Sequence, residues 1–262
     1  MRVERLSSIA GGFDGVLLDQ FGVLHDGHRL YPGALEVLEG LKSSEIPVAI
    51  LTNSGKRTAA NRERLLSLGV PRDTFVDVVT SGELAYHSLM VGFEVTGRAP
   101  YAFIVGTPGE EYGFDLVPTV DDPKAADVIL FLGSDAPRTS LDAYRELLGD
   151  AKAPAICCNP DRWRITRDGL QPGAGAIAEA YAQMGGQVTW IGKPYPEIYL
   201  NACASLGGAS RVLCVGDSAE HDVAGGRSAG LTTMLVMTGV SDGLDGEHVE
   251  PRPDYWMERL RW

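Results

Sequence analysis

Long apolar segments and cysteines are both scarce in this sequence. In its 262 residues no run approaches the roughly 18 apolar residues of a membrane-spanning helix. Residues 1–6 are not followed by the apolar segment of a secretory leader. The four cysteines contain no C-x-x-C pair, the spacing typical of many metal and redox sites. We therefore expect a cytoplasmic protein with reduced, buried thiols and no membrane partner.

Basic residues are also few. Lys and Arg together number 23 against 35 Asp and Glu, which gives a formal net charge of −12 at pH 7. A surface that binds nucleic acid needs clustered Lys and Arg, so we expect no nucleic-acid partner. A small phosphorylated ligand needs only one local positive site. An acidic chain also suits a divalent cation held by carboxylates.

What the sequence does contain is a strand pattern that ends on an acid. Residues 15–25 read Gly-Val-Leu-Leu-Asp-Gln-Phe-Gly-Val-Leu-His. The apolar run at residues 16–18 predicts a buried strand, Asp19 closes it, and Gly22 lets the backbone turn away. An open α/β sheet presents catalytic groups in this way, at the carboxyl ends of its strands. The alternative is an Asp that only caps a turn.

Apolar strands and periodic helices alternate along the rest of the chain. Further strands are predicted at residues 47–51, 75–79, 101–105, 128–132, 154–158, 188–191, 211–215 and 232–237. Helices are predicted at residues 34–41, 58–68, 141–148, 173–184, 195–206 and 219–229. This alternation predicts the α/β class, with a doubly wound, Rossmann-like parallel sheet. The middle of the chain is long enough for a domain of its own, so we expect a core of residues 1–82 and 187–262 and a smaller inserted α/β domain of residues 83–186.

Polar groups of different kinds stand at four of the predicted strand ends. They are Asp19; Thr52 with Asn53 and Ser54; Lys193; and Asp217 with Asp222. At one sheet edge, Asp19 and Asp217 can hold Mg²⁺ beside a phosphate. The hydroxyl and backbone N–H groups of the turn at residues 52–54 can cradle phosphoryl oxygens, and Lys193 can neutralise developing charge. Asp19 is then placed to act as a nucleophile.

These residues stand in a familiar order. Asp-Gln-Phe-Gly-Val at residues 19–23, Leu-Thr-Asn at 51–53, Gly-Lys-Pro at 192–194 and Gly-Asp-Ser at 216–218 with Asp222 resemble the four motifs of the haloacid dehalogenase superfamily. The segments at residues 22–27, 80–82, 159–161 and 173–175 are similar to those of its NagD-like class IIA phosphatases. In those proteins an α/β cap occupies the interval between the second and third motifs, which here holds the inserted domain.

The resemblance implies a role for each matching residue. Asp19 would be the nucleophile and a Mg²⁺ ligand, with the backbone carbonyl of Phe21 and the carboxylate of Asp217 as further ligands. Asp222 would lie near the metal or orient Lys193, which would stabilise charge on the phosphoryl group. The phosphoryl group itself would be held by Thr52, Asn53 and Ser54.

The inserted domain carries the residues that the resemblance assigns to substrate choice. Asn159 and Asp161 follow a predicted strand on a loop that would help select the substrate, or they form an Asx turn before Trp163. Arg162 and Arg164 are solvated surface charges or contacts to a substrate anion. The family's substrates include sugar phosphates, nucleotides, phosphoglycolate and pyridoxal phosphate. Its caps are often dimer surfaces, so a homodimer is one expected state.

One position departs from the family pattern. The family has Asp-x-Asp in its first motif, and the second Asp protonates the leaving group and then activates water; here that position is Phe21. General acid–base help contributes about 10²–10⁴ in rate, so its loss leaves two hypotheses. The first is Mg²⁺-dependent hydrolysis of a small phosphate ester through Asp19, with His25 as a substitute acid or base or a plain turn histidine. The second is a weakly active or non-catalytic protein that binds a phosphorylated metabolite.

Two unrelated interpretations are weaker. A phosphoacceptor of the response-regulator kind would also use an acid, a hydroxyl and a lysine at strand ends, but the long insertion argues against it. The segment at residues 173–178 matches the dinucleotide pattern G-x-G-x-x-A, which requires a strand directly before it. We expect a turn there instead, and therefore no nicotinamide cofactor.

Overall fold

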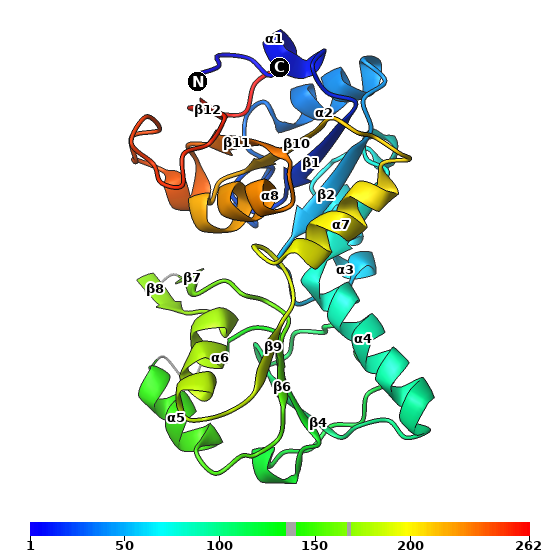
Figure 1. Ribbon diagram of the computed structural model, residues 1–262, viewed down its shortest axis with the longest axis vertical. Helices are drawn as coiled ribbons and strands as arrows, with labels where there is room; N and C mark the ends of the chain where they lie inside the picture. The colour runs from blue at the N-terminus through cyan, green and yellow to red at the C-terminus, as the bar shows by residue number, and fades with distance from the viewer. Residues whose placement is uncertain (135–139, 167–168) are drawn as a thin grey trace. The chain divides into compact units, whose positions relative to one another are not determined.

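The computed structural model describes residues 1–134, 140–166 and 169–262. The chain folds into two compact units (Figure 1). Unit 1 consists of Met1–Thr52, Asn61–Val79 and Lys193–Trp262, and unit 2 consists of Asn53–Ala60 and Thr80–Gly192. Among the described residues, no helix combines the length and apolar character that crossing a bilayer requires.

Unit 1 is built on a six-stranded sheet in the order β12–β11–β10–β1–β2–β3. The strands are β1 (Gly15–Asp19), β2 (Val48–Thr52), β3 (Asp77–Thr80), β10 (Val212–Gly216), β11 (Thr232–Val236) and β12 (Tyr255–Met257). Numbered along this unit, the order is 3-2-1-4-5-6, the arrangement of a doubly wound sheet. The direction of winding reverses between β1 and β10, which pair in parallel with Leu18 opposite Val215.

Helices cover both faces of this sheet. They are α1 (Ser7–Ala10), α2 (Ala34–Ser43), α3 (Thr58–Ser67), α7 (Pro196–Ser205) and α8 (Ala224–Ser228). Short helical turns are η1 (Arg72–Thr74), η3 (Ala219–Val223, a π-helical turn) and η4 (Gly239–Ser241). Met234 and Val236 of β11 belong to the buried cluster that contains α2, whereas Leu235 packs in a separate cluster with Val223. The sheet is therefore buried on both sides, which is why its strands read as continuous apolar runs.

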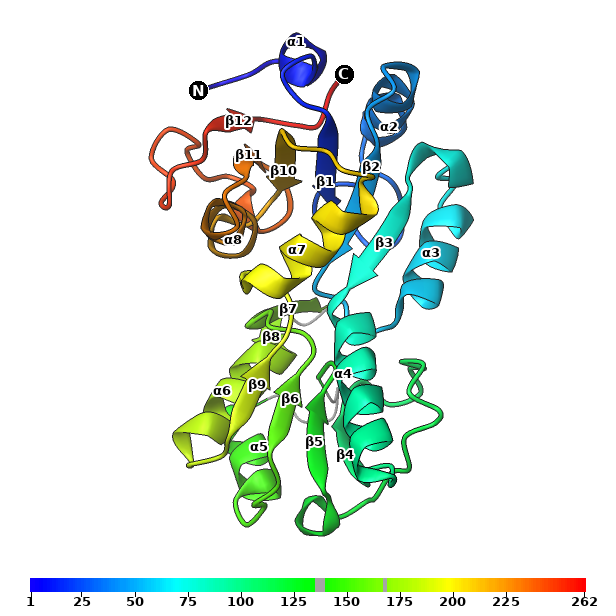
Figure 2. The ribbon, with the colours of Figure 1, turned by 45° about the vertical axis from the view of Figure 1, so that its right-hand side comes forward.

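Unit 2 contains a four-stranded parallel sheet in the order β4–β5–β6–β9 (Figure 2). Its strands are β4 (Ala102–Val105), β5 (Val128–Phe131), β6 (Ala155–Cys157) and β9 (Val188–Trp190), and an antiparallel hairpin joins β7 (Trp163–Thr166) to β8 (Gly169–Pro172). Its helices are α4 (Ser81–Thr96), η2 (Pro123–Ala125), α5 (Leu141–Leu148) and α6 (Ala174–Gln183). Two buried clusters pack on this sheet, one with α4 and one with α5 and α6.

The predicted α/β class and doubly wound parallel sheet are confirmed. The division of the chain differs from the predicted one at its edges. Residues 187–192 were expected in the core, but β9 pairs with β6 in unit 2, because packing context and not local propensity decides which sheet a short strand joins. Residues 169–172, expected to form a turn, are strand β8; it belongs to an antiparallel hairpin and not to a parallel nucleotide-binding unit.

Candidate active site

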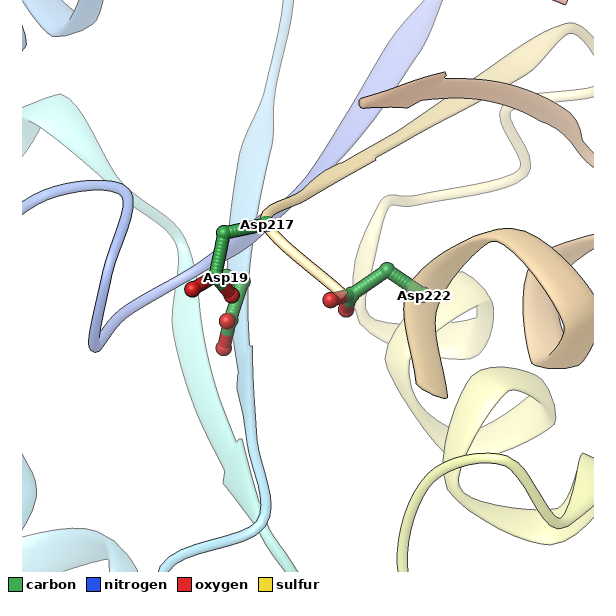
Figure 3. Close-up of side chains that lie close together, drawn as sticks. All are labelled: Asp19, Asp217 and Asp222. Atoms are coloured by element: carbon green, nitrogen blue, oxygen red, sulfur yellow. The ribbon is translucent and has the colours of Figure 1, made fainter. Parts of the chain in front are cut away.

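Four charged side chains gather at the carboxyl edge of the sheet in unit 1. Asp19 ends β1 and Asp217 follows β10, so the parallel pairing of the two strands brings the carboxylates together. Asp222 lies on the π-helical turn η3, and Figure 3 shows its carboxylate directed toward the other two. A ligand atom from each of the three acids lies within 4.8 Å of those of the others. Lys193, the first residue of the chain's return to unit 1, completes the group.

Lys193 links two of the acids. Its Nζ lies 2.8 Å from Asp19 Oδ1 and 2.7 Å from Asp222 Oδ1. All four side chains are buried, with no more than 7% of any residue exposed. Buried charges persist only when they are paired or bind an ion, and here the one ammonium contacts two of the three clustered carboxylates. The cluster therefore has an excess of negative charge out of contact with water.

The protonation of the cluster reflects this excess. Burial raises the pKa of Asp19 to about 7, against the attraction of Lys193 and with the help of Asp222. Burial and the neighbouring Asp19 raise the pKa of Asp217 well above its usual range. Burial alone would lower the pKa of Lys193, but the two carboxylates outweigh it and raise that pKa. Lys193 thus stays charged at neutral pH, and its single positive charge does not balance the three carboxyl groups.

The donor set fits a hard divalent cation. Carboxylate oxygens are the ligands that Mg²⁺ and Ca²⁺ prefer in proteins. Asp19 and Asp217 lie side by side in Figure 3. Asp222 is differently engaged, because its Oδ1 accepts from Lys193 and its Oδ2 accepts from the backbone N–H of Ser218 at 3.1 Å. The structure thus favours Asp19 and Asp217 as direct ligands and Asp222 as the residue that orients Lys193.

The predicted phosphate cradle follows β2. Thr52 ends that strand, one position past Leu51, which lies opposite Asp19 in the sheet, and it is 5% exposed. Thr52 is therefore in unit 1 with the acids. Asn53 and Ser54 belong to unit 2, where the Ser54 hydroxyl accepts a 3.3 Å hydrogen bond from the backbone N–H of Lys56.

The other predicted substrate residues come together in unit 2. Asn53 Nδ2 donates to Asp161 Oδ1 at 2.9 Å, and the Ser81 hydroxyl donates to Asn53 Oδ1 at 3.3 Å. Asn159 Oδ1 accepts from the backbone N–H of Asp161 at 3.1 Å, which is the Asx turn that the sequence left as an alternative. Asn159 is thus used locally, whereas Asp161 reaches the turn after β2.

Phe21 and His25 form one side of the turn after β1. The Phe21 side chain is 47% exposed, and its ring meets the edge of His25 at a centroid distance of 5.7 Å. His25 lies in this turn, as one alternative predicted, but it is fully buried. Its Nδ1 accepts from the backbone N–H of Gly27 at 2.9 Å, and burial, with Arg64, lowers its pKa to about 4. His25 is therefore neutral at pH 7, with its proton on Nε2, which has no partner among the described residues.

The two arginines of the hairpin differ. Arg162 forms a half-exposed ion pair with Glu179 at 2.9 Å. Arg164 Nη1 donates to Thr107 Oγ1 at 3.0 Å and to the carbonyl and hydroxyl of Ser134, both at 3.1 Å. Arg164 is thus an internal support of unit 2 and not a solvated charge.

A cavity of about 560 Å³ lies elsewhere in unit 2. It is lined by residues 103–108, 110–115, 117 and 119, with Tyr144 and Leu147. None of the predicted site residues is among them. We place the chemistry at the acid cluster, because buried charge and hydrogen bonding converge there and the cavity wall carries no lysine, arginine or histidine.

The residues that surround Asp217 were not predicted from the sequence. Val240 N–H donates to Asp217 Oδ2 at 2.8 Å, and Ser241 Oγ donates to the Asp217 carbonyl at 2.6 Å. Both residues follow β11, the strand next to β10. Neighbouring parallel strands end at the same edge of a sheet, so the end of β11 is a signal that the loop after it lies beside Asp217.

Comparisons with known proteins agree with this geometry. A family profile described as haloacid dehalogenase-like hydrolase matches residues 16–111, and one described as HAD-hydrolase-like matches residues 190–262. The chain is 31% identical over 263 residues to the D-glycerol 3-phosphate phosphatase of Mycobacterium tuberculosis, covering 98% of this chain and 72% of that protein. It is 28% identical to the ribonucleotide monophosphatase NagD of Escherichia coli over 263 residues, covering 92% and 94%. A crystal structure of a haloacid dehalogenase-like hydrolase from Brucella suis superposes with a TM-score of 0.84 at 26% identity, covering 98% and 99% of the two chains.

Proposed function

Because this chain belongs to the haloacid dehalogenase-like hydrolases of class IIA and is a phosphatase of that family, we propose that it hydrolyses a small phosphate monoester through an aspartyl-phosphate on Asp19. The observation that carries the proposal is the buried cluster in which Lys193 Nζ lies 2.8 Å from Asp19 Oδ1, with Asp217 and Asp222 beside it. Such a cluster binds positive charge and then the phosphoryl group that accompanies it.

In the first step a carboxylate oxygen of Asp19 attacks phosphorus. The new P–O bond forms on Asp19 while the bond to the leaving oxygen breaks, and that oxygen departs with the electron pair. Lys193 stabilises the negative charge on the equatorial phosphoryl oxygens, and Asp222 and Asp19 hold its ammonium in place. Water then attacks the phosphorus of the aspartyl-phosphate, which releases phosphate and restores the Asp19 carboxylate.

The residues present fit Mg²⁺ as the cofactor. Asp19 and Asp217 would hold it with their carboxylates and Phe21 with its backbone carbonyl, with Asp222 next to this set. When bound, Mg²⁺ would supply positive charge that offsets the repulsion between the acids and the phosphoryl oxygens. Thr52, Asn53 and Ser54 would donate to those oxygens through hydroxyl, amide and backbone N–H groups.

Substrate choice is proposed for unit 2, in the role of a cap. The bond between Asn53 and Asp161 supports this, because it ties the turn proposed to bind phosphate to the loop proposed to recognise the rest of the substrate. Asn159 would shape that loop through its Asx turn. The partner we propose is a small phosphorylated metabolite in the cytoplasm, and a homodimer is the proposed assembly.

A weakly active or non-catalytic binding protein is the second candidate, and Phe21 favours it. The Phe21 side chain has no ionisable proton to give to a leaving group, and His25 is buried and neutral. Substrates whose leaving groups depart without a proton would then be the best ones. The presence of Asp19, Lys193 and Asp217 together argues for turnover, because the nucleophile is paired with the lysine and a second carboxylate lies beside it.

Phosphate release from a panel of phosphate esters with Mg²⁺ tests the proposal. The variants are Asp19→Asn and Phe21→Asp, and the matched control for the first is Asp142→Asn, an exposed carboxylate on α5. We expect activity in the wild type and the control but not in Asp19→Asn. A silent wild type with an active Phe21→Asp would favour the binding role. Silence of all proteins with every ester would contradict the proposed hydrolysis.

A further inference from the structure

The loop after β11 binds two parts of the site at once. The Thr238 hydroxyl donates to the backbone carbonyl of Gly22 at 2.6 Å. Two residues on, the Val240 N–H donates to Asp217 Oδ2 at 2.8 Å, and Ser241 Oγ donates to the Asp217 carbonyl at 2.6 Å. This loop therefore connects the turn that follows Asp19 to the acid at the end of β10. Neither the mechanism above nor the motifs of the sequence give it a role.

The connection is close-packed at two glycines. Gly22 has φ +87° and Gly239 has φ +56°, and a Cβ at either position would overlap the Asp217 carboxylate. A Cβ on Gly239 would also lie only 2.7 Å from the Cα of Gly22. Three chain segments thus meet around one carboxylate with no room for a side chain between them. Movement of the loop is transmitted directly to Asp217 and to the turn after β1.

These contacts limit the positions that the proposed ligand oxygens of the site can take around a cation. Oδ2 of Asp217 is directed by the Val240 N–H, so the rotation of the carboxylate is set by the loop. The Gly22 carbonyl is held by Thr238, which fixes the peptide that follows the proposed Phe21 ligand. Mg²⁺ requires nearly ideal octahedral geometry, whereas Ca²⁺ accepts more ligands at longer and more variable distances. A ligand set held this firmly favours the smaller ion.

We infer that Thr238 is a positioning residue that, with Val240 and Ser241, holds Asp217 and the turn after β1 in the geometry that makes the site selective for Mg²⁺ over Ca²⁺. The inference rests on the proposed function, because it takes Asp19, Phe21 and Asp217 as the ligands. Thr238 touches neither the cation nor the phosphoryl group. It acts through the Gly22 carbonyl and through the loop that it anchors.

The test compares dissociation constants for Mg²⁺ and Ca²⁺, measured by titration calorimetry without substrate, and then steady-state phosphate release. The variants are Thr238→Val, which keeps the shape and removes the hydroxyl, and Thr238→Ser, which keeps the hydroxyl. For Thr238→Val we expect the Mg²⁺ dissociation constant to rise about tenfold, as loss of one partly buried hydrogen bond allows, and the Ca²⁺ constant to rise about twofold or less. Thr238→Ser should keep the wild-type preference for Mg²⁺ over Ca²⁺.

The matched control is Thr233→Val, on strand β11 directly before this loop. Thr233 is buried, and its hydroxyl donates to Asp254 Oδ2 at 2.9 Å, away from the acid cluster. This variant should lower the melting temperature at least as much as Thr238→Val and leave the ratio of the two dissociation constants unchanged. A ratio that shifts equally in both variants, or in neither, overturns the inference.

Failure of this inference is distinguishable from failure of the proposed function. If the wild type binds Mg²⁺ and releases phosphate but Thr238→Val keeps the wild-type ion ratio, only the positioning role is wrong. If the wild type releases phosphate equally well without any divalent cation, the proposed ligand set is wrong, and the positioning role falls with it.

Discussion

The two units use the carboxyl edge of a parallel sheet in opposite ways. In unit 1 the edge carries three buried carboxylates, two of which are paired with Lys193. In unit 2 the edge after β4 and β5 carries Thr107 and Ser134, and the guanidinium of Arg164 donates to both. Polar groups in unit 2 thus find partners within the unit, whereas unit 1 retains an excess of negative charge. The comparison indicates that chemistry belongs to unit 1 and that the edge of unit 2 is a structural support.

The largest expected effect comes from removing the positively charged side chain at the edge of each sheet, Lys193 in unit 1 and Arg164 in unit 2. Lys193→Met leaves two buried carboxylates without their partner, so we expect phosphate release to fall by about 10³-fold or more and the free energy of unfolding to fall by about 3–5 kcal/mol. Arg164→Met should cost about 1–3 kcal/mol and leave kcat within about threefold. Steady-state kinetics and urea unfolding of both variants provide the measurement. A similar loss of kcat in both would remove the distinction between the two edges.

The next effect concerns the proton that Phe21 cannot supply. Phe21→Asp should raise kcat/KM for alkyl phosphates by about 10²-fold, because a carboxylic acid can protonate a poor leaving group. The gain should be much smaller for aryl phosphates, whose leaving groups depart as stable anions. Phe21→Ala is the control, since it removes the ring without adding an acid. Equal gains for Phe21→Asp and Phe21→Ala would point to steric relief instead.

A smaller effect is expected from pH on metal binding. The pKa of Asp19 is raised to about 7, so this carboxyl holds its proton below pH 7 and must lose it to bind a cation. Affinity for Mg²⁺ should therefore rise as the pH increases through 7, and because the pKa of the second ligand, Asp217, is also raised, the rise should continue above pH 7. Calorimetry in buffers of different ionisation enthalpy should detect proton release at pH 6. A Mg²⁺ affinity that falls as the pH rises would contradict the raised pKa of Asp19.

The smallest effect is expected in unit 2. Asp161→Asn keeps the shape of the loop and removes the negative charge from the side chain that accepts from Asn53 Nδ2. We expect KM to change about three- to tenfold, to different extents for different esters, with kcat nearly constant. Asp115→Asn, on an exposed carboxylate of the same unit, is the control. A large loss of kcat with every ester would place Asp161 in the chemistry and weaken the division between the units.

Much of the site could be predicted from the sequence, because strand ends in a parallel sheet are local signals. Apolar runs located β1 and β10, and the acids that follow them met as expected. The sheet that β9 would join could not be predicted, since the short run at residues 188–190 suits an edge in either unit. The burial of His25 also could not be predicted from the sequence, because it depends on the packing of the turn around Phe21 and Gly27.

Two helical features were missed for different physical reasons. The predicted helix at residues 219–229 begins as a π-helical turn, and this turn aims Asp222 at Lys193. Helix α4 was not predicted at all. Its second half is exposed yet rich in apolar residues, with Val91 60% and Val95 83% exposed, so it has no amphipathic period to detect.

Trapping the phosphorylated enzyme tests the central claim most directly. Protein mixed with Mg²⁺ and a good aryl phosphate would be quenched in acid within milliseconds to seconds, digested and examined by mass spectrometry. Because Phe21 cannot activate water, we expect the intermediate to accumulate, with one phosphoryl group on the peptide that contains Asp19 and none in Asp19→Asn. Release of phosphate with no phosphoryl group on Asp19 at any quench time would contradict the account.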